Sequence, residues 1–297
     1  MNDLMQLIVS GLLIGVSYGV LAAGLALIFG VMKIINFAHA DFAVLAMYIP
    51  AFFFLNWWGI DPFLSVVIAM PLFFLFGYGM QRFLIDKVMG SSEDAEEAET
   101  ATLIITLGLA LVVGNIMLMV FSGAPRMIDQ PYTSAAWNVS GVYINKAQTY
   151  SFFISLGLIF ALFWFLNKTM AGKAVQAAAD DPESCAYMGI SYRFVCGLAF
   201  GLGTAITAAG GCLLATYRPF NPFYGESIII ILFASVVLGG ITSITGALLG
   251  ALIIGLLQQV SSLFFSLALQ NVAVFALFVL FLYLRPQGIL GKRARTV

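Results

Sequence analysis

The sequence predicts an all-α membrane protein, a polytopic bundle of about eight to nine transmembrane helices. Three observations support this fold class. Hydrophobic residues fill 62% of the 297 positions and charged residues only 9%, which leaves too little polar surface to cover a soluble globule. Seven stretches without Asp, Glu, Lys or Arg reach or exceed the roughly 20 residues that a bilayer-spanning helix needs. The alternating pattern of a membrane β-barrel is absent.

The uncharged stretches set the expected spans in order along the chain. They are residues 4–32, 42–60, 62–81, 100–125, 147–167, 194–217 and 227–284. The last stretch has 58 residues, enough for about two to three crossings. No basic region precedes the first stretch, so we expect it to remain as the first helix and not to be a cleaved signal peptide. The segments between spans are short, which predicts one membrane domain over residues 1–297.

The basic residues predict the orientation, because Lys and Arg near span ends are retained in the cytoplasm. If the N-terminus lies outside and the spans alternate, ten of the 13 basic residues fall inside, including those of the C-terminal tail. Only Arg126, Lys146 and Arg218 fall outside. The C-terminus is then inside, provided that the last stretch crosses an odd number of times.

Glycine spacing predicts how the helices meet. Gly11, Gly15 and Gly19 recur every four residues on one helical face, which favours close approach of a neighbouring backbone. Gly246 and Gly250 repeat the arrangement. The pair at 239–240 begins the sequence GGITSITGALLGA, where small polar residues interrupt an apolar run; this pattern fits either close packing or a broken helix that lines a polar cavity.

The hydrophilic segment 168–193 is expected to form two short helices. One covers residues around 172–179, and the second begins at Asp181 and Pro182, since Asp suits an N-cap and Pro the first helical position. Gly189 is expected to end the second helix as a C-cap residue. The segment is either a plain connection or a surface for a cytoplasmic partner.

At these residues the chain resembles a known family. Glu183, followed six residues later by Gly189, is similar to the Glu-Ala-Ala, three residues, Gly pattern in the coupling loop of ATP-binding cassette importer permeases, with Ser184 and Cys185 in place of the alanines. Three longer stretches resemble the permeases of branched-chain amino acid importers: GVSYGVLAAGLALIFGVMKIINFAHADF, MAGKAVQAAADDPESCAYMGI and SVVLGGITSITGALLGALIIGL. In that family the opening motif usually ends Ile-Asn-Phe-Ala-His-Gly-Glu, whereas this chain has Ala40 and Asp41 in the last two places.

The resemblance implies a multi-pass subunit of a bacterial-type inner membrane that moves branched-chain or other neutral amino acids. Its implied partners are a second related permease, two cytoplasmic ATPases, an extracytoplasmic binding protein, the small-molecule substrate and lipid, with no nucleic acid. The implied coupling residues are Gly172, Lys173, Asp181, Glu183, Ser184, Cys185 and Gly189. The chain has no phosphate-binding loop of its own, so ATP hydrolysis is expected in the partner subunits and not in this chain.

Two further groups are candidate contacts within this scheme. Asn36, His39 and Asp41 either face water in a cytoplasmic turn next to Lys33, or lie in a break within a span and face the pathway together with Gly239 and Gly240. In loop 217–226, Asn221 and Pro222 either form a plain turn or meet the binding protein.

Other functions fit the sequence less well. A single histidine with no nucleophile or metal partner nearby does not supply a catalytic site, and the three cysteines lack metal-ligand spacing, so we expect neither a cofactor nor a metal. An ion-coupled carrier normally has ionisable residues inside its spans, which these spans lack unless Asp41 or Glu226 lies deeper than expected. Urea or short amides remain alternative substrates for the same type of permease.

Overall fold

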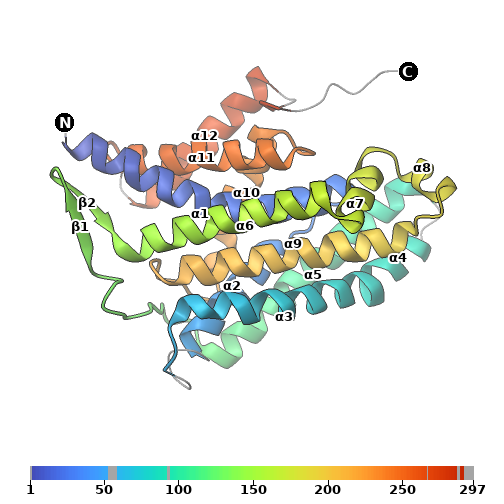
Figure 1. The fold of residues 1–297 in the computed structure, drawn as a ribbon, viewed down its shortest axis with the longest axis horizontal. Helices are drawn as coiled ribbons and strands as arrows, with labels where there is room; N and C mark the ends of the chain where they lie inside the picture. The colour runs from blue at the N-terminus through green and yellow to red at the C-terminus, as the bar shows by residue number, and fades with distance from the viewer. Residues whose placement is uncertain (1, 53–58, 92–93, 266, 286–287, 291–297) are drawn as a thin grey trace.

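The computed structural model describes residues 2–52, 59–91, 94–265, 267–285 and 288–290, and these are largely helical (Figure 1). The α-helices are α1 (Asn2–Met32), α2 (His39–Ile49), α3 (Ser65–Met80), α4 (Asp86–Ser91), α5 (Ala95–Phe121), α6 (Lys146–Lys168), α7 (Met170–Asp180), α8 (Pro182–Tyr187), α9 (Tyr192–Ala215), α10 (Tyr224–Gly239), α11 (Ile244–Ser261) and α12 (Leu267–Leu284). A 3₁₀ turn, η2 (Pro62–Leu64), and a π-helical turn, η3 (Gln81–Ile85), flank α3. The predicted all-α fold class is confirmed.

Six of the described helical stretches are long and apolar enough to cross a bilayer. They are Leu4–Met32, Pro62–Gly90, Glu96–Phe121, Lys146–Lys168, Tyr192–Ala215 and Ile244–Ser261. Three shorter apolar helices lie at His39–Phe52, Tyr224–Gly239 and Val274–Leu284. Together they match the expected eight to nine passages, and the stretch 227–284 divides into parts of α10, α11 and α12.

The bundle has two distinct ends (Figure 1). The hairpin end holds the N-terminus and the two strands, β1 (Ala136–Val139) and β2 (Val142–Asn145). The coupling end holds α4, α7 and α8. Residues 288–290 lie at the coupling end, because the backbone N–H groups of Ile289 and Leu290 donate to the carbonyls of Leu238 and Gly239 at the end of α10, each at 2.9 Å. The start and the end of the described chain therefore lie at opposite ends of the bundle.

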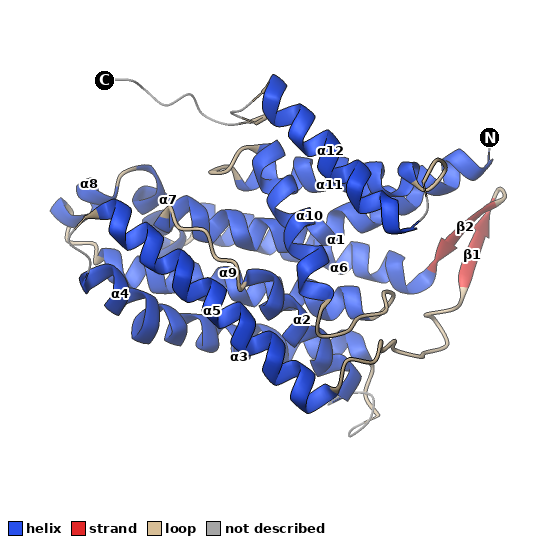
Figure 2. Cartoon of the chain, turned by 180° about the vertical axis from the view of Figure 1, so that it is seen from behind, coloured by secondary structure: helices blue, strands red, loops and turns tan. Residues whose placement is uncertain are grey.

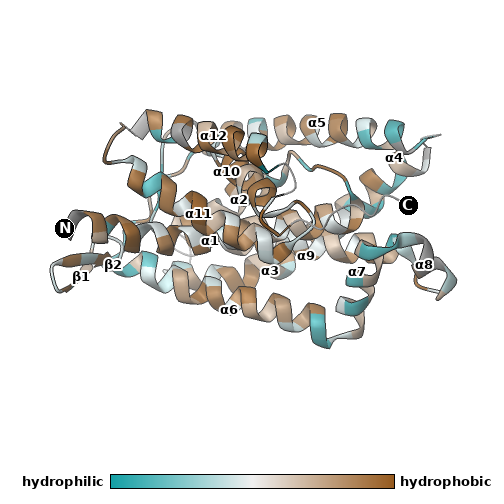
Figure 3. Cartoon of the chain, turned by 90° about the horizontal axis from the view of Figure 1, so that it is seen from above, coloured by the Kyte–Doolittle hydropathy of each residue, from teal (hydrophilic) through white to brown (hydrophobic). Residues whose placement is uncertain are grey.

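Helices α1 and α9 form the centre of the bundle, where 89% of the apolar window of each helix is buried. Helices α5 and α6 lie on opposite sides of this centre and are largely exposed (Figure 3). The hydropathy colouring shows brown, apolar stretches along the middle of the long helices and teal, polar residues at α4 and α7, as expected for a protein that crosses a bilayer.

Glycines bring the backbones of neighbouring helices into contact, as their spacing predicts. A Cβ atom at Gly11 or Gly15 of α1 would lie 2.8 or 2.9 Å from a Cα atom of α11. On the next seam, a Cβ at Gly250 of α11 would lie only 2.0 Å from the carbonyl oxygen of Ser235 in α10. The α1–α11 and α10–α11 seams therefore depend on the missing side chains.

The β-hairpin was not expected from the sequence. Its strands pair antiparallel from Ala136 opposite Asn145 to Val139 opposite Val142. Ser140 and Gly141 form the two-residue turn with positive φ angles of 52° and 86°, which suits the twist of a tight hairpin.

Candidate functional site

The polar motif near the start of the chain lies in a break between two helices. Helix α1 ends at Met32, and Lys33 takes a positive φ of 57° that turns the chain out of the helix. The Lys33 ammonium donates to the carbonyl of Gly30 at 2.8 Å, so it satisfies an otherwise free carbonyl at the end of α1. Residues 33–38 then run without regular helix until α2 begins at His39.

His39 lies deep inside the bundle. Its Nε2 is 3.3 Å from the carbonyl oxygen of Leu21 in α1 and 2.7 Å from the hydroxyl of Thr207 in α9. A carbonyl only accepts, and the Thr207 hydroxyl donates to Gly203, so the arrangement favours the tautomer with hydrogen on Nε2. Leu21 lies 11 residues before the end of α1, which is about 16 Å along the helix. Because His39 contacts Leu21, the chain returns about this far into the bundle before α2 begins.

Asn36 is enclosed as well. Its Oδ1 accepts a hydrogen bond of 3.0 Å from the backbone N–H of Ala38, which holds the turn into α2. Asn36 and His39 are both fully buried, and among the described residues neither the Asn36 Nδ2 nor the His39 Nδ1 has a hydrogen-bond partner. In this structure the two side chains do not face water, and the segment is a break inside the bundle and not an exposed turn.

Asp41, one half-turn further along α2, meets the beginning of α10. A Cβ atom at Gly225 would lie 2.7 Å from the Asp41 Oδ1, so the carboxylate rests against the α10 backbone. Glu226 follows Gly225 directly and lines the same cavity as Asp41. Two carboxylates, 185 residues apart in sequence, therefore lie beside one cavity where α2 and α10 begin, roughly 20 Å from the end of α10 at Gly239.

A cavity of about 380 Å³ surrounds these carboxylates. Its walls come from the starts of α2 and α10 and from the middle of α5, which crosses the front of the molecule in Figure 2. The residues that line it are Asp41, Leu107, Ala110, Leu111, Gly114, Asn115, Leu118, Pro222, Phe223 and Glu226. The lining contains no basic residue, so the cavity combines negative charge with an apolar wall.

The expected helices of segment 168–193 are present as α7 and α8. Gly172 packs so closely on the end of α6 that a Cβ would lie 2.1 Å from the carbonyl oxygen of Phe165. Lys173 and Asp181 are exposed, whereas Cys185 is completely buried and anchors α8. Gly189 has a φ of 74° and follows α8, as a C-cap residue does. The Glu183 and Ser184 side chains lie outside the described part of the structure.

Two side chains connect α1 to this segment. The Lys33 ammonium also donates to the carbonyl of Ala179 in α7 at 3.3 Å, and the Tyr192 hydroxyl donates to the carbonyl of Val31 at 3.1 Å. The sequence analysis missed the Tyr192 contact, because a tyrosine at the end of a span is typical of an interface residue. The connecting segment 33–38 is therefore tied at its start to the coupling end.

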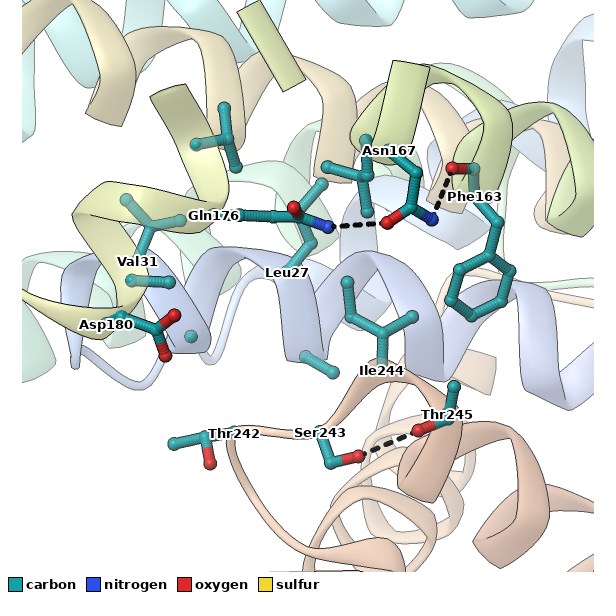
Figure 4. Close-up of a pocket in the computed structure, with 15 residues that line it drawn as sticks. Leu27, Val31, Phe163, Asn167, Gln176, Asp180, Thr242, Ser243, Ile244 and Thr245 are labelled. Carbon is teal, nitrogen blue, oxygen red and sulfur yellow. Dashed lines mark hydrogen bonds between the residues drawn. The ribbon is translucent and has the colours of Figure 1, made fainter. Parts of the chain in front are cut away.

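A second cavity of about 320 Å³ lies beside α7 (Figure 4). It is bounded by the end of α1, the α6–α7 junction and residues 242–245. Gln176 donates to Asn167 across the junction at 3.3 Å, and the Ser243 and Thr245 hydroxyls face each other at 3.0 Å. The cavity therefore separates α7 from the start of α11.

Of the remaining candidate residues, Gly239 and Gly240 lie apart from Asp41, whereas Pro222 lines the same cavity. Gly239 forms the close contact with α11, where a Cβ would lie 2.0 Å from the Gly246 carbonyl oxygen, and Gly240 ends α10 with a φ of 110°. Neither lines the carboxylate cavity. Asn221 is partly exposed and its side chain accepts from the Phe223 N–H at 3.1 Å, while Pro222 is buried in the cavity wall.

The loops at the hairpin end hold an ordered polar contact. The Tyr132 hydroxyl donates to the Asp61 carboxylate at 3.2 Å. Burial, together with the negative charge of Asp61, raises the pKa of Tyr132 above its ordinary value. The phenol therefore stays neutral and hydrogen-bonded at physiological pH.

A multi-pass helical bundle in which short apolar helices begin beside a cavity with two carboxylates is typical of a membrane transport protein. The family comparison is specific: residues 7–284 match the family of branched-chain amino acid transport system permease components, and the chain belongs to this family. Its role is therefore that of a transport permease subunit.

Named relatives match over nearly the whole length. The chain is 29% identical to the high-affinity branched-chain amino acid transport system permease protein BraD of Pseudomonas aeruginosa, with 97% of this chain and 96% of the relative covered. It is 28% identical to LivH of Escherichia coli K12 over the same shares of the two chains. It is 27% identical to the probable permease LivH of Methanocaldococcus jannaschii, over 91% of this chain and 87% of the relative. No solved structure gives a significant match.

Proposed function

We propose that the chain forms one side of the pathway of an ATP-binding cassette importer for branched-chain or other neutral amino acids, and that the solute passes Asp41 and Glu226. The observation that carries this proposal is the cavity in which the two carboxylates meet. A free amino acid brings an ammonium group, which the carboxylates attract, and an apolar side chain, which suits walls such as Leu107 and Leu111.

The two carboxylates also favour amino acids over the alternative substrates, urea and short amides. Urea and short amides carry no ammonium group, so a pathway for them gains nothing from two negative charges inside the membrane, where such charges are costly. The names of the relatives, which refer to branched-chain amino acid transport, support the same choice.

The coupling end is proposed to face the cytoplasm. In the described part of the chain, seven basic residues lie in or beside the elements of the coupling end: Lys33, Arg82, Lys87, Lys168, Lys173, Arg193 and Arg285. Three lie in or beside the loops of the hairpin end: Arg126, Lys146 and Arg218. The excess agrees with the retention of positive charge in the cytoplasm and supports an N-terminus on the outside. The three basic residues at 292, 293 and 295 lie outside the described residues.

Helices α7 and α8 are proposed to contact the ATPase subunits, with residues 172–189 as the coupling segment. Lys33 and Tyr192 then transmit the movement of this segment to residues 33–38 and so to the carboxylate cavity. The hairpin end meets the binding protein, and Asn221, which is partly exposed, is the better placed of the two candidate contacts.

Reconstitution of the full transporter in vesicles tests the proposal. We expect uptake of leucine, isoleucine or valine that requires ATP and the binding protein, since uptake without either one supports an ion-coupled carrier instead. Asp41→Asn and Glu226→Gln are each expected to lower uptake about tenfold or more, because a hydrogen bond to a charged group contributes about 1.5–3 kcal/mol.

Glu96→Gln is the matched control. Glu96 is an exposed carboxylate in the first turn of α5, far from the cavity, so its loss should leave uptake unchanged. Normal uptake by both cavity variants contradicts the proposed pathway.

A further inference from the structure

The outer side of α5 combines three features that do not suit contact with lipid. The Asn115 amide is exposed in the apolar part of the helix and donates only to its own helix, to Leu111 at 2.7 Å. The cavity with Asp41 and Glu226 is open to the surface of the chain along the same side, where Glu226 is exposed. Polar and ionisable groups in membrane spans normally face protein or a water-filled cavity, because hydrocarbon cannot hydrogen-bond them.

The glycines of α5 differ from those of the other seams. A Cβ atom at Gly108 or Gly114 would have no heavy atom within 4 Å, whereas those at Gly11, Gly15 and Gly250 would collide with a neighbouring helix. Glycines on a membrane helix let another backbone approach closely. The spaces beside Gly108 and Gly114 are unfilled in the isolated chain, and so is the space beside Gly157 on α6. The exposed polar groups, and not the glycines alone, therefore distinguish α5 from α6.

Helix α6, on the opposite side of the bundle, shows the arrangement expected for contact with lipid (Figure 3). Its central polar residues, Ser151 and Ser155, are buried and face inward. Its exposed central residues are apolar, among them Phe153, Leu156 and Phe160. The two outer helices of the same chain therefore present different surfaces, and only the surface of α5 leaves polar groups uncovered.

We infer that the α5 side, from Gly108 to Asn115 together with the mouth of the carboxylate cavity, is the surface that binds the second, related permease. This inference rests on the proposed function, in which a second permease takes part. The occupant has to be a membrane protein, because the open groups lie on the apolar part of α5. It closes the cavity from the other side, so that Asp41 and Glu226 face the partner across the pathway and not the lipid.

A pair of glycine variants tests the surface directly. Gly108→Trp on α5 and Gly157→Trp on α6 each add the same side chain at a position where a Cβ meets nothing within 4 Å. Both single chains should fold equally well, as judged by thermal unfolding of the isolated subunit. We expect Gly108→Trp to reduce co-purification of the second permease about tenfold, and Gly157→Trp to leave it unchanged.

Photo-crosslinking in the assembled transporter gives a second readout. A photoreactive amino acid at Leu111, which is 68% exposed, should form an adduct with the second permease, whereas one at Phe160, which is 73% exposed, should not. Equal co-purification of the two glycine variants, an adduct only from position 160, or an adduct with a second copy of this chain overturns the inference.

The result is separable from the test of the pathway. Asp41→Asn is expected to assemble normally and lose uptake, because the Asp41 side chain packs against the α10 backbone and not on the surface, while Gly108→Trp loses assembly itself. If Gly108→Trp loses assembly but the carboxylate variants retain uptake, the proposed pathway is wrong and the inferred interface is supported.

Discussion

The α10–α11 seam allows a quantitative prediction from one added methyl group. In Gly250→Ala, the new Cβ would lie 2.0 Å from the Ser235 carbonyl oxygen and 3.0 Å from the Gly239 nitrogen. Both atoms belong to the α10 backbone, so no side chain can rotate away. An ordinary contact begins at 3.4 Å, so α11 must move away from α10 by about 1.4 Å. Overpacking of this kind costs about 1–3 kcal/mol.

The control is Gly157→Ala, which adds the same methyl group to the open side of α6. Both variants gain about 1 kcal/mol from the higher helix propensity of alanine, so their difference isolates the overlap at the seam. Thermal unfolding of the purified subunit in detergent should therefore give a lower melting temperature for Gly250→Ala than for Gly157→Ala, by about 2–4 °C per kcal/mol. Equal melting temperatures contradict the close packing of α10 on α11.

Two further predictions concern the motif that links the cavity to the coupling end. Thr207→Val removes the nearer acceptor of the His39 Nε2 hydrogen and should lower the free energy of unfolding by about 1 kcal/mol. Thr207→Ser keeps the hydroxyl, so its melting temperature in the same thermal assay should be close to that of the wild type. Lys33→Met removes the hydrogen bonds to Gly30 and Ala179, and we expect the transporter to retain ATP hydrolysis while uptake per ATP falls. Lys33→Arg keeps a hydrogen-bond donor and should retain part of the uptake. If Lys33→Met has the wild-type ratio of uptake to ATP hydrolysis, the hydrogen bonds of Lys33 are not part of the coupling route.

The sequence is sufficient to predict features that depend on local pattern. Runs of apolar residues identify the long helices, and four-residue glycine spacing identifies the α1–α11 seam, because both signals lie within one helix. Capping residues have the same local character, so the limits of α7 and α8 agree with the expectation from Asp181, Pro182 and Gly189.

The cavity depends on contacts that no local pattern contains. Hydropathy treats residues 42–60 as one span, whereas the helical stretch His39–Phe52 begins inside the bundle, where His39 is fully buried. The surroundings of Asp41 depend on how far residues 33–38 run back along α1. Tertiary packing sets this distance, and the local sequence does not. The cluster of Pro, Asn and Gly in YRPFNPFYGE, directly before Glu226, is the signal that indicates a second irregular entry.

The Gly239–Gly240 pair combines the two structures that its sequence allows. Gly239 packs directly on α11, while Gly240 ends α10 with a positive φ and residues 242–245 line the second cavity. The β-hairpin was not predicted because its two strands have only four residues each and are largely exposed, so they lack a period-two apolar pattern.

Alternating access at position 41 tests the central claim most directly. In Asp41→Cys, a polar thiol reagent should label the new thiol from the outside in one state of the ATPase cycle and from the cytoplasmic side in the other. The native cysteines at 185, 196 and 212 are buried, and Ala43→Cys, which replaces a fully buried residue beside Gly211, should remain unlabelled. Labelling of position 41 from one side only in every state, or no labelling at all, contradicts a pathway past the two carboxylates.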